Sequence, residues 1–259
     1  MSGVRSRSRR WHGPVAALAL AVAALLGPAA ARAGEVHVAV AANFTAAAKE
    51  IAALYEAASG DKAVLSFGST GQLYTQIDQG APFEVFLAAD RARPRKAVEE
   101  GLADPGTLVT YATGRIVLYS RDPGRVTGEA TLHAAGSGKL AIANPATAPY
   151  GTAAVQAMQA LGVYDAVAPR LVQGNNIAQT YQFVESGGAE LGFVALSQVI
   201  GHDRGSRWVV PFRLYTPIAQ DAVLLNAGTR NPAAAGFLRF LQGPEARAVK
   251  EKYGYGAAD

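Results

Sequence analysis

The chain has 259 residues and no cysteine, which excludes disulfide bonds, thiol catalysis and a lipid-modified N-terminal cysteine. It carries 24 Lys and Arg against 20 Asp and Glu, but five of the basic residues and none of the acidic ones lie within positions 1–33. The rest of the chain is therefore close to neutral, with 19 basic and 20 acidic side chains. Such a balance gives no support for binding to nucleic acid or to an anionic membrane.

Residues 1–33 have the pattern of a secretory signal peptide. Four arginines lie between positions 5 and 10, a stretch rich in Ala, Leu and Val runs from Pro14 to Leu26, and Ala31-Arg32-Ala33 fits a small-residue cleavage site. The apolar stretch is shorter than the roughly 20 residues that a membrane-spanning helix needs. We therefore expect export, cleavage near Ala33-Gly34 and a soluble periplasmic protein.

Hydrophobic periodicity after the signal predicts alternating strands and helices. In chain order we expect a strand at 36–40, helix at 44–58, strand at 62–67, helix at 71–79, strand at 84–88, helix at 94–100, strand at 114–119, strand at 139–143, helix at 152–161, strand at 171–173, helix at 177–186, strand at 191–195, a short helix to 200, a strand at 221–225, and helices at 232–241 and 244–253. This order predicts an α/β fold in which mostly parallel sheets are flanked by helices.

The length and element order favour two lobes joined by two strand-like crossings, one near Thr113 and one near Gln220. We expect lobe 1 to comprise residues 34–114 together with 221–259, and lobe 2 to comprise residues 115–220. No internal repeat, low-complexity tract or Pro-rich linker interrupts this arrangement.

Four short segments each lie where an expected strand gives way to a helix. They are Ala42-Asn43-Phe44-Thr45, Ser69-Thr70-Gly71-Gln72, Pro149-Tyr150-Gly151-Thr152 and Gly174-Asn175-Asn176-Ile177. The first N–H groups of a helix have no acceptor within the helix, and the helix dipole is positive at that end. Ligands of open α/β sheets bind at the carboxyl ends of parallel strands, so the four segments together predict one anion site.

Each of these segments also has an ordinary structural explanation. Asn43 is a good helix N-cap candidate, and a serine such as Ser69 commonly caps a helix. Tyr150 at a loop–helix junction is more often a packing residue, although its phenol could donate a hydrogen bond. Ile177 could offer only its backbone N–H. The hypothesis of a site therefore depends on all four segments jointly.

The four segments contain no Lys, Arg, Asp or Glu. A dianion bound there would be held by neutral N–H and O–H donors, each charge-assisted bond contributing roughly 1.5–3 kcal/mol. Such a site accepts a fully ionised tetrahedral oxyanion, and it offers no carboxylate to receive a proton from a protonated one.

Other candidate motifs do not indicate a cofactor. The segment 136–141 resembles G-x-G-x-x-A but precedes a strand instead of following one, and Gly138-Lys139 lacks the remainder of a P-loop. The four histidines show neither a zinc spacing nor a partner nucleophile. We expect Asp90 to be a helix cap or an inter-lobe hydrogen-bond acceptor rather than a general base. We interpret the aromatic residues of the C-terminal tail as part of the core.

In order and spacing the chain resembles the periplasmic molybdate-binding components of ABC-type importers, over essentially its whole length after the signal. The segments that carry the resemblance are Ala-Ala-Asn-Phe at 41–44, Phe-Gly-Ser-Thr-Gly-Gln-Leu at 67–73, Pro-Tyr-Gly-Thr-Ala at 149–153, Glu-Leu-Gly-Phe-Val at 190–194 and Leu-Gln-Gly-Pro-Glu-Ala at 241–246.

This resemblance implies a type II periplasmic binding protein whose two lobes close over molybdate, and over tungstate as well. It places the ligand contacts on Asn43, Thr70, the adjacent Ser69, Tyr150 and the backbone of Ile177. Asn43 stands where many members have Ser, and Ala195 stands where some have a ligand-binding Tyr, so Tyr150 is expected to supply the phenol. The resemblance also implies a membrane permease as partner, a monomer, no cofactor, no bare metal ion and no enzymatic activity.

Three alternatives accompany this interpretation. The first is a receptor for sulfate, phosphate or another small anion on the same fold. The second is an exported hydrolase using Ser69 or Asp90, for which the sequence provides no base–nucleophile pair. The third is a scaffold protein, which would show no ligand-dependent stabilisation.

Overall fold

The computed structural model describes residues 2–3, 33–134, 136, 138–201 and 203–256. By its internal contacts the chain divides into Met1–Ala33 and Gly34–Asp259, and the description below concerns the second unit alone. Nearly all of the predicted signal peptide lies outside the described residues.

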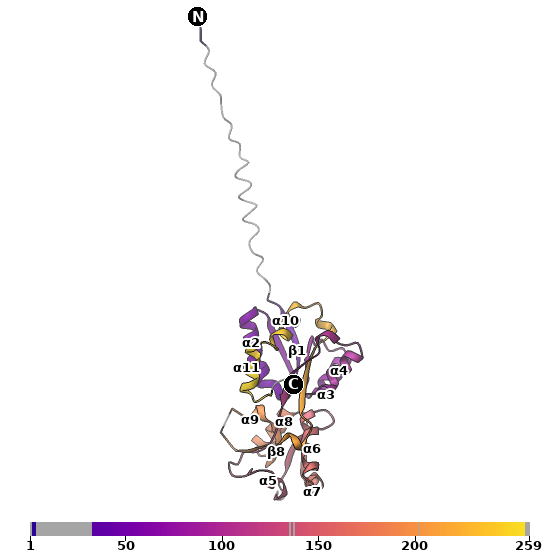
Figure 1. Ribbon diagram of the computed structural model, residues 1–259, viewed down its shortest axis with the longest axis vertical. Coiled ribbons are helices and arrows are strands. Elements are labelled where there is room, and N and C mark those ends of the chain that lie inside the picture. Colours follow the sequence, from indigo (N-terminus) through magenta and orange to yellow (C-terminus); the bar gives the residue numbers. More distant parts are fainter. Residues whose placement is uncertain (1, 4–32, 135, 137, 202, 257–259) are drawn as a thin grey trace. The chain divides into compact units, whose positions relative to one another are not determined.

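Two five-stranded sheets form the centre of this unit (Figure 1). The first has the order β2 (Lys62–Gly68), β1 (Glu35–Ala41), β3 (Val85–Leu87), β10 (Ile218–Leu224) and β4 (Val109–Gly114). The second has the order β7 (Leu171–Gly174), β6 (Leu140–Ala143), β8 (Leu191–Ala195), β5 (Ile116–Ser120) and β9 (Ser206–Val209). Both sheets therefore have the same plan.

One strand in each sheet runs against the other four. β1 pairs in parallel with β2 and β3, whereas β10 is antiparallel to both β3 and β4. In the second sheet β6 is parallel to β7 and β8, and β5 is antiparallel to β8 and β9. The chain passes from the first sheet into the second through the reversed strand β5, and it returns to the first sheet through the reversed strand β10. The predicted mostly parallel, two-lobed architecture is confirmed.

Helices cover both faces of each sheet. Around the first lie α2 (Thr45–Ser59), α3 (Thr70–Asp78), α4 (Ala92–Glu99), α10 (Pro232–Phe240) and α11 (Pro244–Lys252), and around the second lie α5 (Ala130–His133), α6 (Pro149–Ala160), α7 (Tyr164–Val167), α8 (Ile177–Glu185) and α9 (Leu196–Val199). The 3-10 turns are η1 (Ala42–Phe44), η2 (Pro105–Thr107), η3 (Ala168–Arg170), η4 (Phe212–Leu214) and η5 (Asn226–Gly228). Figure 1 shows α2 and α11 on the side of β1 opposite to α3 and α4.

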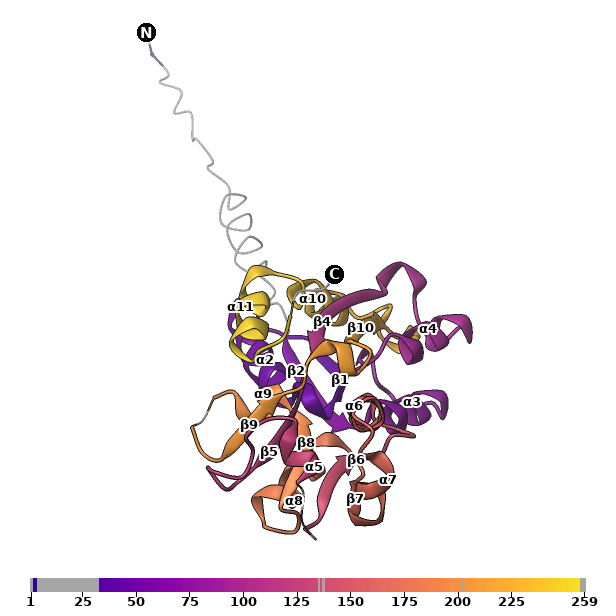
Figure 2. The same ribbon diagram turned by 60° about the horizontal axis from the view of Figure 1, so that its bottom comes forward.

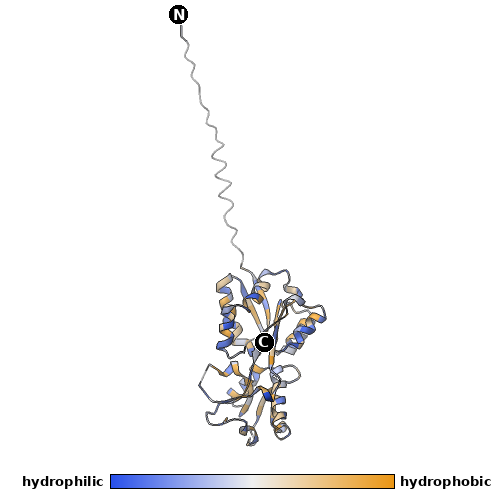
Figure 3. Ribbon diagram, viewed as in Figure 1, coloured by the Kyte–Doolittle hydropathy of each residue, from blue (hydrophilic) through white to orange (hydrophobic). Residues whose placement is uncertain are grey.

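Successive side chains of a strand point to opposite faces of the sheet, so each sheet has a hydrophobic core on both faces. Val36, Val38 and Val40 of β1 join one buried cluster with residues of α2, α10 and α11. Ala39 points the other way, into a cluster with residues of α3 and α4. Apolar colour is accordingly concentrated along the strands and the inner faces of the helices (Figure 3). Burial on both faces explains why the strand sequences are almost continuously apolar.

The two crossings between the sheets lie next to each other. β4 ends at Gly114 and β5 begins at Ile116, so a single residue separates them. The return strand β10 lies beside β4 (Figure 2). In this pairing Ile218 is opposite Gly114. Gly256, near the C-terminus, forms an antiparallel bridge with Thr113 on the same strand. The crossings and the C-terminal segment therefore form one paired hinge region.

Several predicted boundaries were wrong. The strand expected at 114–119 begins at Ile116, because Gly114 is the last residue of β4, a strand that was not predicted; β9 was not predicted either. The helix expected from residue 152 begins at Pro149, which suits a first helical position because it needs no N–H there. The strand expected at 221–225 begins three residues earlier, at Ile218.

No helix in the described part of the chain has both the length and the apolar character that a membrane crossing requires. Among the same residues, no group of three or more His, Asp or Glu side chains is arranged to hold a metal ion.

Candidate functional site

All four of the predicted segments meet at one small cavity. Its volume is about 10 Å³. Its lining consists of Ala41, Ala42, Asn43, Gly68, Ser69, Thr70, Ala89, Ala148, Pro149, Tyr150 and Ile177. Each of the five predicted site residues is among them, and none of the lining residues is charged. The helices η1, α3, α6 and α8 therefore direct their N-terminal ends to a common point.

The side chain of Asn43 does not cap a helix, so this prediction was wrong. Asn43 is 3% exposed and lies inside the turn η1, and the N-cap position of α2 belongs to Phe44. Its Nδ2 donates to Gln220 Oε1 at 2.9 Å and to the hydroxyl of Tyr255 at 3.2 Å. Both amide hydrogens are thereby used within the protein, which leaves the backbone N–H at the start of η1 as the donor that this residue can offer.

The second segment caps its helix as expected. Ser69 Oγ accepts from the Gln72 N–H at 3.4 Å and donates to Gln72 Oε1 at 2.8 Å, so the serine hydroxyl is occupied. Thr70 differs, because its Oγ1 accepts from the Ala89 N–H at 3.0 Å and keeps its own proton. Thr70 is 1% exposed, and no acceptor among the described residues takes that proton. A buried hydroxyl with a proton to donate is therefore present at the cavity.

The third segment contributes a backbone N–H and a buried phenol. Tyr150 is in the first turn of α6, following Pro149, which has no N–H. The Gly151 and Thr152 N–H groups donate to Ala148 O, and the N–H of Tyr150 remains as the first donor of the helix. The Tyr150 hydroxyl extends to the crossing strands, where Gln220 Nε2 lies 3.4 Å away.

The fourth segment presents only a backbone donor, as expected. Asn176 caps α8, with its Oδ1 accepting from the Gln179 N–H at 3.0 Å. Ile177 is the first residue of that helix and is 3% exposed. Its N–H has no acceptor within the helix, while its carbonyl accepts from Gln198 Nε2 at 3.1 Å. Ile177 is thus fixed on its carbonyl side and open on its N–H side.

The tyrosines around the cavity stay neutral. Burial raises the pKa of Tyr150 well above its usual value of 10, and nearby tyrosines raise it further. Burial likewise raises the pKa of Tyr111 and of Tyr255 above that value. The lining of the cavity therefore carries no ionised side chain, and the helix ends that meet there favour negative charge.

Hydrogen bonds join the two lobes on opposite sides of the cavity. On one side the Gly71 N–H donates to Thr147 O at 2.8 Å. On the other side Ser197 Oγ donates to Asn43 O at 2.9 Å and lies 3.1 Å from the hydroxyl of Tyr255. Because these contacts join segments of the two sheets across the cavity, the structure represents a closed arrangement of the lobes.

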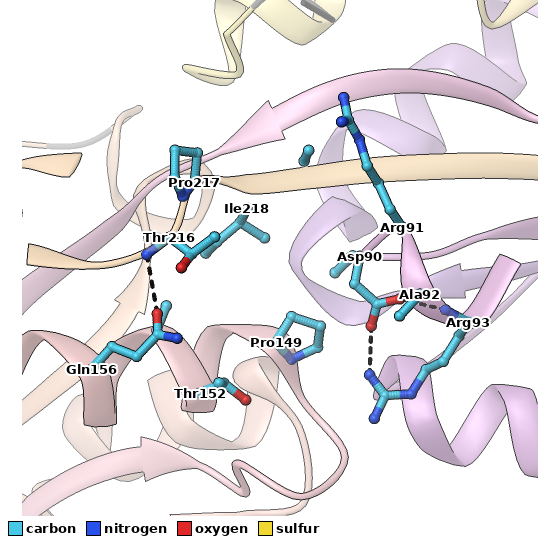
Figure 4. A pocket seen from close by; sticks show the side chains of 13 residues that line it. Asp90, Arg91, Ala92, Arg93, Pro149, Thr152, Gln156, Thr216, Pro217 and Ile218 are labelled. Carbon is cyan, nitrogen blue, oxygen red and sulfur yellow. Dashed lines mark hydrogen bonds and ion pairs between the residues drawn. The ribbon is translucent and has the colours of Figure 1, made fainter. Parts of the chain in front are cut away.

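A larger groove adjoins the cavity and shares Ala89 and Pro149 with it (Figure 4). Asp90 lies on this groove and is not placed as a base, because it accepts from the Arg93 N–H at 2.9 Å and forms an ion pair with the Arg93 guanidinium. Arg93 Nη2 also donates to Ala146 O at 3.2 Å, which connects the two lobes. Asp90 therefore accepts from an N–H in the first turn of α4, as a cap would, although the N-cap position itself is Arg91. The inter-lobe hydrogen bond belongs to Arg93.

Sequence reasoning did not identify three of the residues that surround the site. The sequence predicts Gln220 only as a crossing position and Tyr255 as a core residue, and it gives Ser197 no role. The ring of Tyr255 does pack in the core, edge-on to Phe44 with centroids 5.0 Å apart, but its hydroxyl binds Asn43. The one signal available was the polar pair Gln220-Asp221 inside an otherwise apolar strand.

The family model for bacterial extracellular solute-binding proteins matches residues 36–256. The chain belongs to this family. The molybdate-binding protein of Rhodobacter capsulatus is 54% identical over 238 residues, which are 92% of this chain and 94% of that protein. The molybdate-binding protein of Azotobacter vinelandii is 51% identical over 243 residues, with coverage of 92% and 96%.

Solved structures of solute-binding proteins have the same fold. A periplasmic molybdate-binding protein of Azotobacter vinelandii superimposes with a TM-score of 0.84 at 36% identity, covering 86% of this chain and all of that chain. The resemblance predicted from the motifs to the molybdate-binding members of the family is therefore confirmed. Relatives of this kind bind a solute rather than transform it.

Proposed function

We propose that this protein captures molybdate, and tungstate with it, and delivers it to the membrane permease of an ABC-type importer. The observation that carries the proposal is the meeting of four helix N-termini at one small cavity whose lining has no charged side chain. Its membership among solute-binding proteins with molybdate-binding relatives supports the same substrate.

The proposed ligand contacts are the residues that line the cavity at the four helix starts, which we call the corners of the site. Asn43, Tyr150 and Ile177 contribute backbone N–H groups, and Thr70 contributes both its N–H and its hydroxyl. Ser69 supports this corner by capping α3. Oxygens of a tetrahedral dianion would then be distributed among helix ends, where aligned peptide dipoles favour negative charge.

Binding follows from closure of the two lobes, taken as residues 34–114 with 221–259 and residues 115–220. The anion first meets the donors of one lobe, and the second lobe adds its own donors as the hinge closes. Only the closed form makes both sets of contacts, so the ligand shifts the population toward it. No covalent step is involved, and the protein acts as a monomer in the periplasm after removal of residues 1–33.

Selectivity would arise from the size and protonation of the anion. A smaller sulfate leaves some donors unpaired, which costs roughly 1–3 kcal/mol for each buried group. A phosphate that retains a proton finds no carboxylate among the lining residues to accept it. Molybdate and tungstate, which are larger and fully ionised, avoid both penalties.

Thermal unfolding of the protein without residues 1–33 tests this proposal. Molybdate, tungstate, sulfate and phosphate are each added in excess, and a ligand at about 100 times its Kd stabilises the native state by about 2.7 kcal/mol. We expect a raised Tm with molybdate and tungstate alone. A shift with sulfate or phosphate instead would overturn the substrate, and no shift with any anion would favour the hydrolase or scaffold alternatives.

A further inference from the structure

A buried amide lies at the hinge, next to the proposed site. Gln220 is 0% exposed and belongs to β10, the strand by which the chain returns to the first sheet. The pairing of β10 with β4 shifts register between Gln220 and Asp221. Such an irregularity redirects side chains, and here the two neighbouring polar groups serve different partners.

Gln220 contacts a corner of the cavity in each lobe. Its Oε1 accepts from Asn43 Nδ2 at 2.9 Å and from the Tyr111 hydroxyl at 3.1 Å. Its Nε2 donates to the Tyr150 hydroxyl at 3.4 Å. Asn43 and Tyr150 belong to different lobes, so this one amide joins them through the crossing strand.

The contacts of Gln220 determine how the two corners can serve an anion. With the Asn43 amide held by Gln220 and Tyr255, the turn η1 is fixed with its backbone N–H groups at the cavity. With the Tyr150 phenol held at the crossing, the start of α6 is anchored at its cavity end. Gln220 itself does not line the cavity.

The packing at the crossing leaves room for this contact. A Cβ added to Gly114 would lie 2.1 Å from the Tyr150 hydroxyl and 2.5 Å from Gln220 Nε2. Both groups therefore occupy the space that the absence of a side chain at Gly114 leaves free. The hinge glycine, the amide and the phenol form one packed unit.

We infer that Gln220 is a positioning residue for oxyanion binding, which orients the Asn43 and Tyr150 corners from the hinge without touching the ligand. This inference rests on the proposed function. It predicts that the affinity for molybdate depends on the amide group of Gln220, beyond any effect of its substitution on folding.

The first test is Gln220→Glu, measured by calorimetric titration with molybdate from pH 6 to pH 9. A protonated Glu has the shape of Gln and retains one donor, whereas the carboxylate has none and places a negative charge beside the site. Burial raises the pKa of such a carboxyl into the range studied. The titratable groups in contact with the position are Tyr111 and Tyr150, and Tyr255 is joined to it through Asn43; all three phenols remain neutral in this range. Its chain neighbour Asp221 is paired with Arg91 and Arg95.

We expect the affinity of Gln220→Glu to fall at least tenfold from pH 6 to pH 9, while that of the unmodified protein stays constant. The matched control is Gln242→Glu, which makes the same charge change at an exposed position after α10 and should retain constant affinity. A pH-independent affinity in Gln220→Glu equal to that of the control would overturn the inference.

A second variant adds no charge. Gly114→Ala should displace the Tyr150 hydroxyl or Gln220 Nε2 and weaken molybdate binding at least fivefold at every pH, with the Tm of the ligand-free protein measured alongside. If Gln220→Glu does not fold, Gly114→Ala and the volume-matched Gln220→Met decide the matter, and affinity like that of the unmodified protein in both contradicts the inference. Failure of the unmodified protein to bind molybdate would instead overturn the proposed function.

Discussion

Thr70 Oγ1 accepts a hydrogen bond from the Ala89 N–H at 3.0 Å, between the segments that follow β2 and β3, the two strands on either side of β1. This contact joins α3 to the segment after β3, and it orients the hydroxyl so that the proton of Thr70 is directed away from Ala89. Because the side chain is buried at the cavity, the proton is available to an anion there.

Replacement of Thr70 tests this donor. We expect Thr70→Val to lower the affinity for molybdate by about tenfold to a hundredfold, since a hydrogen bond to a charged group contributes roughly 1.5–3 kcal/mol. Thr70→Ser keeps the hydroxyl and should remain within about threefold of the unmodified protein. Calorimetric titration measures both, and equal affinities for the Val and Ser variants would contradict a role for the hydroxyl.

Asn43→Ala should weaken binding by at least about tenfold while the protein remains folded, because the turn η1 loses its two side-chain hydrogen bonds, each contributing roughly 0.5–1.5 kcal/mol. Titration with molybdate measures the affinity, and a melting curve without ligand measures the stability. The matched control is Asn226→Ala, which removes an exposed hydrogen bond from Asn226 Nδ2 to Gly101 O; neither residue lines the cavity. Unchanged affinity in Asn43→Ala would count against this corner of the site.

Arg93 connects the lobes and neutralises Asp90 at the groove beside the cavity. We expect Arg93→Ala to lower the affinity for molybdate by about twofold to tenfold, through a lost inter-lobe hydrogen bond of roughly 0.5–1.5 kcal/mol and an unpaired carboxylate near the anion. Adding Asp90→Asn to this variant should restore part of the affinity. If the double variant binds no better than Arg93→Ala, the repulsion from Asp90 is not responsible.

The pKa of Tyr150, raised by burial, predicts two effects of pH. Below pH 10 the phenols near the site are neutral, so the affinity for molybdate should be constant between pH 6 and pH 9. Above about pH 10, the ordinary tyrosine value, the unfolded chain releases protons that the native state keeps, and the stability of the native state should fall. Titrations across the lower range and melting curves across the upper range test these expectations, and an affinity that changes between pH 6 and pH 9 would contradict the first.

Much of the site could be predicted from local sequence. A strand that ends in small or polar residues and continues into a helical pattern identifies the start of a helix, and this was sufficient to predict that Ser69, Thr70, Tyr150 and Ile177 lie together at one cavity. The N-cap role of Ser69 was confirmed, because a cap depends on residues three positions apart. The same reasoning was wrong for the side chain of Asn43, whose partners are 177 and 212 residues away in the chain.

The sequence by itself determined the class of the fold, the likeness to molybdate-binding proteins and the four helix starts with their uncharged donors. These depend on periodicity, on short-range capping and on the order of motifs along the chain. Only the tertiary structure decided that the Asn43 amide is bonded within the protein, that the Tyr150 phenol reaches the hinge, and that Gln220 joins the two lobes. Those features depend on contacts between β10, the C-terminal segment and residues far away in sequence, and a local pattern contains no information about such contacts.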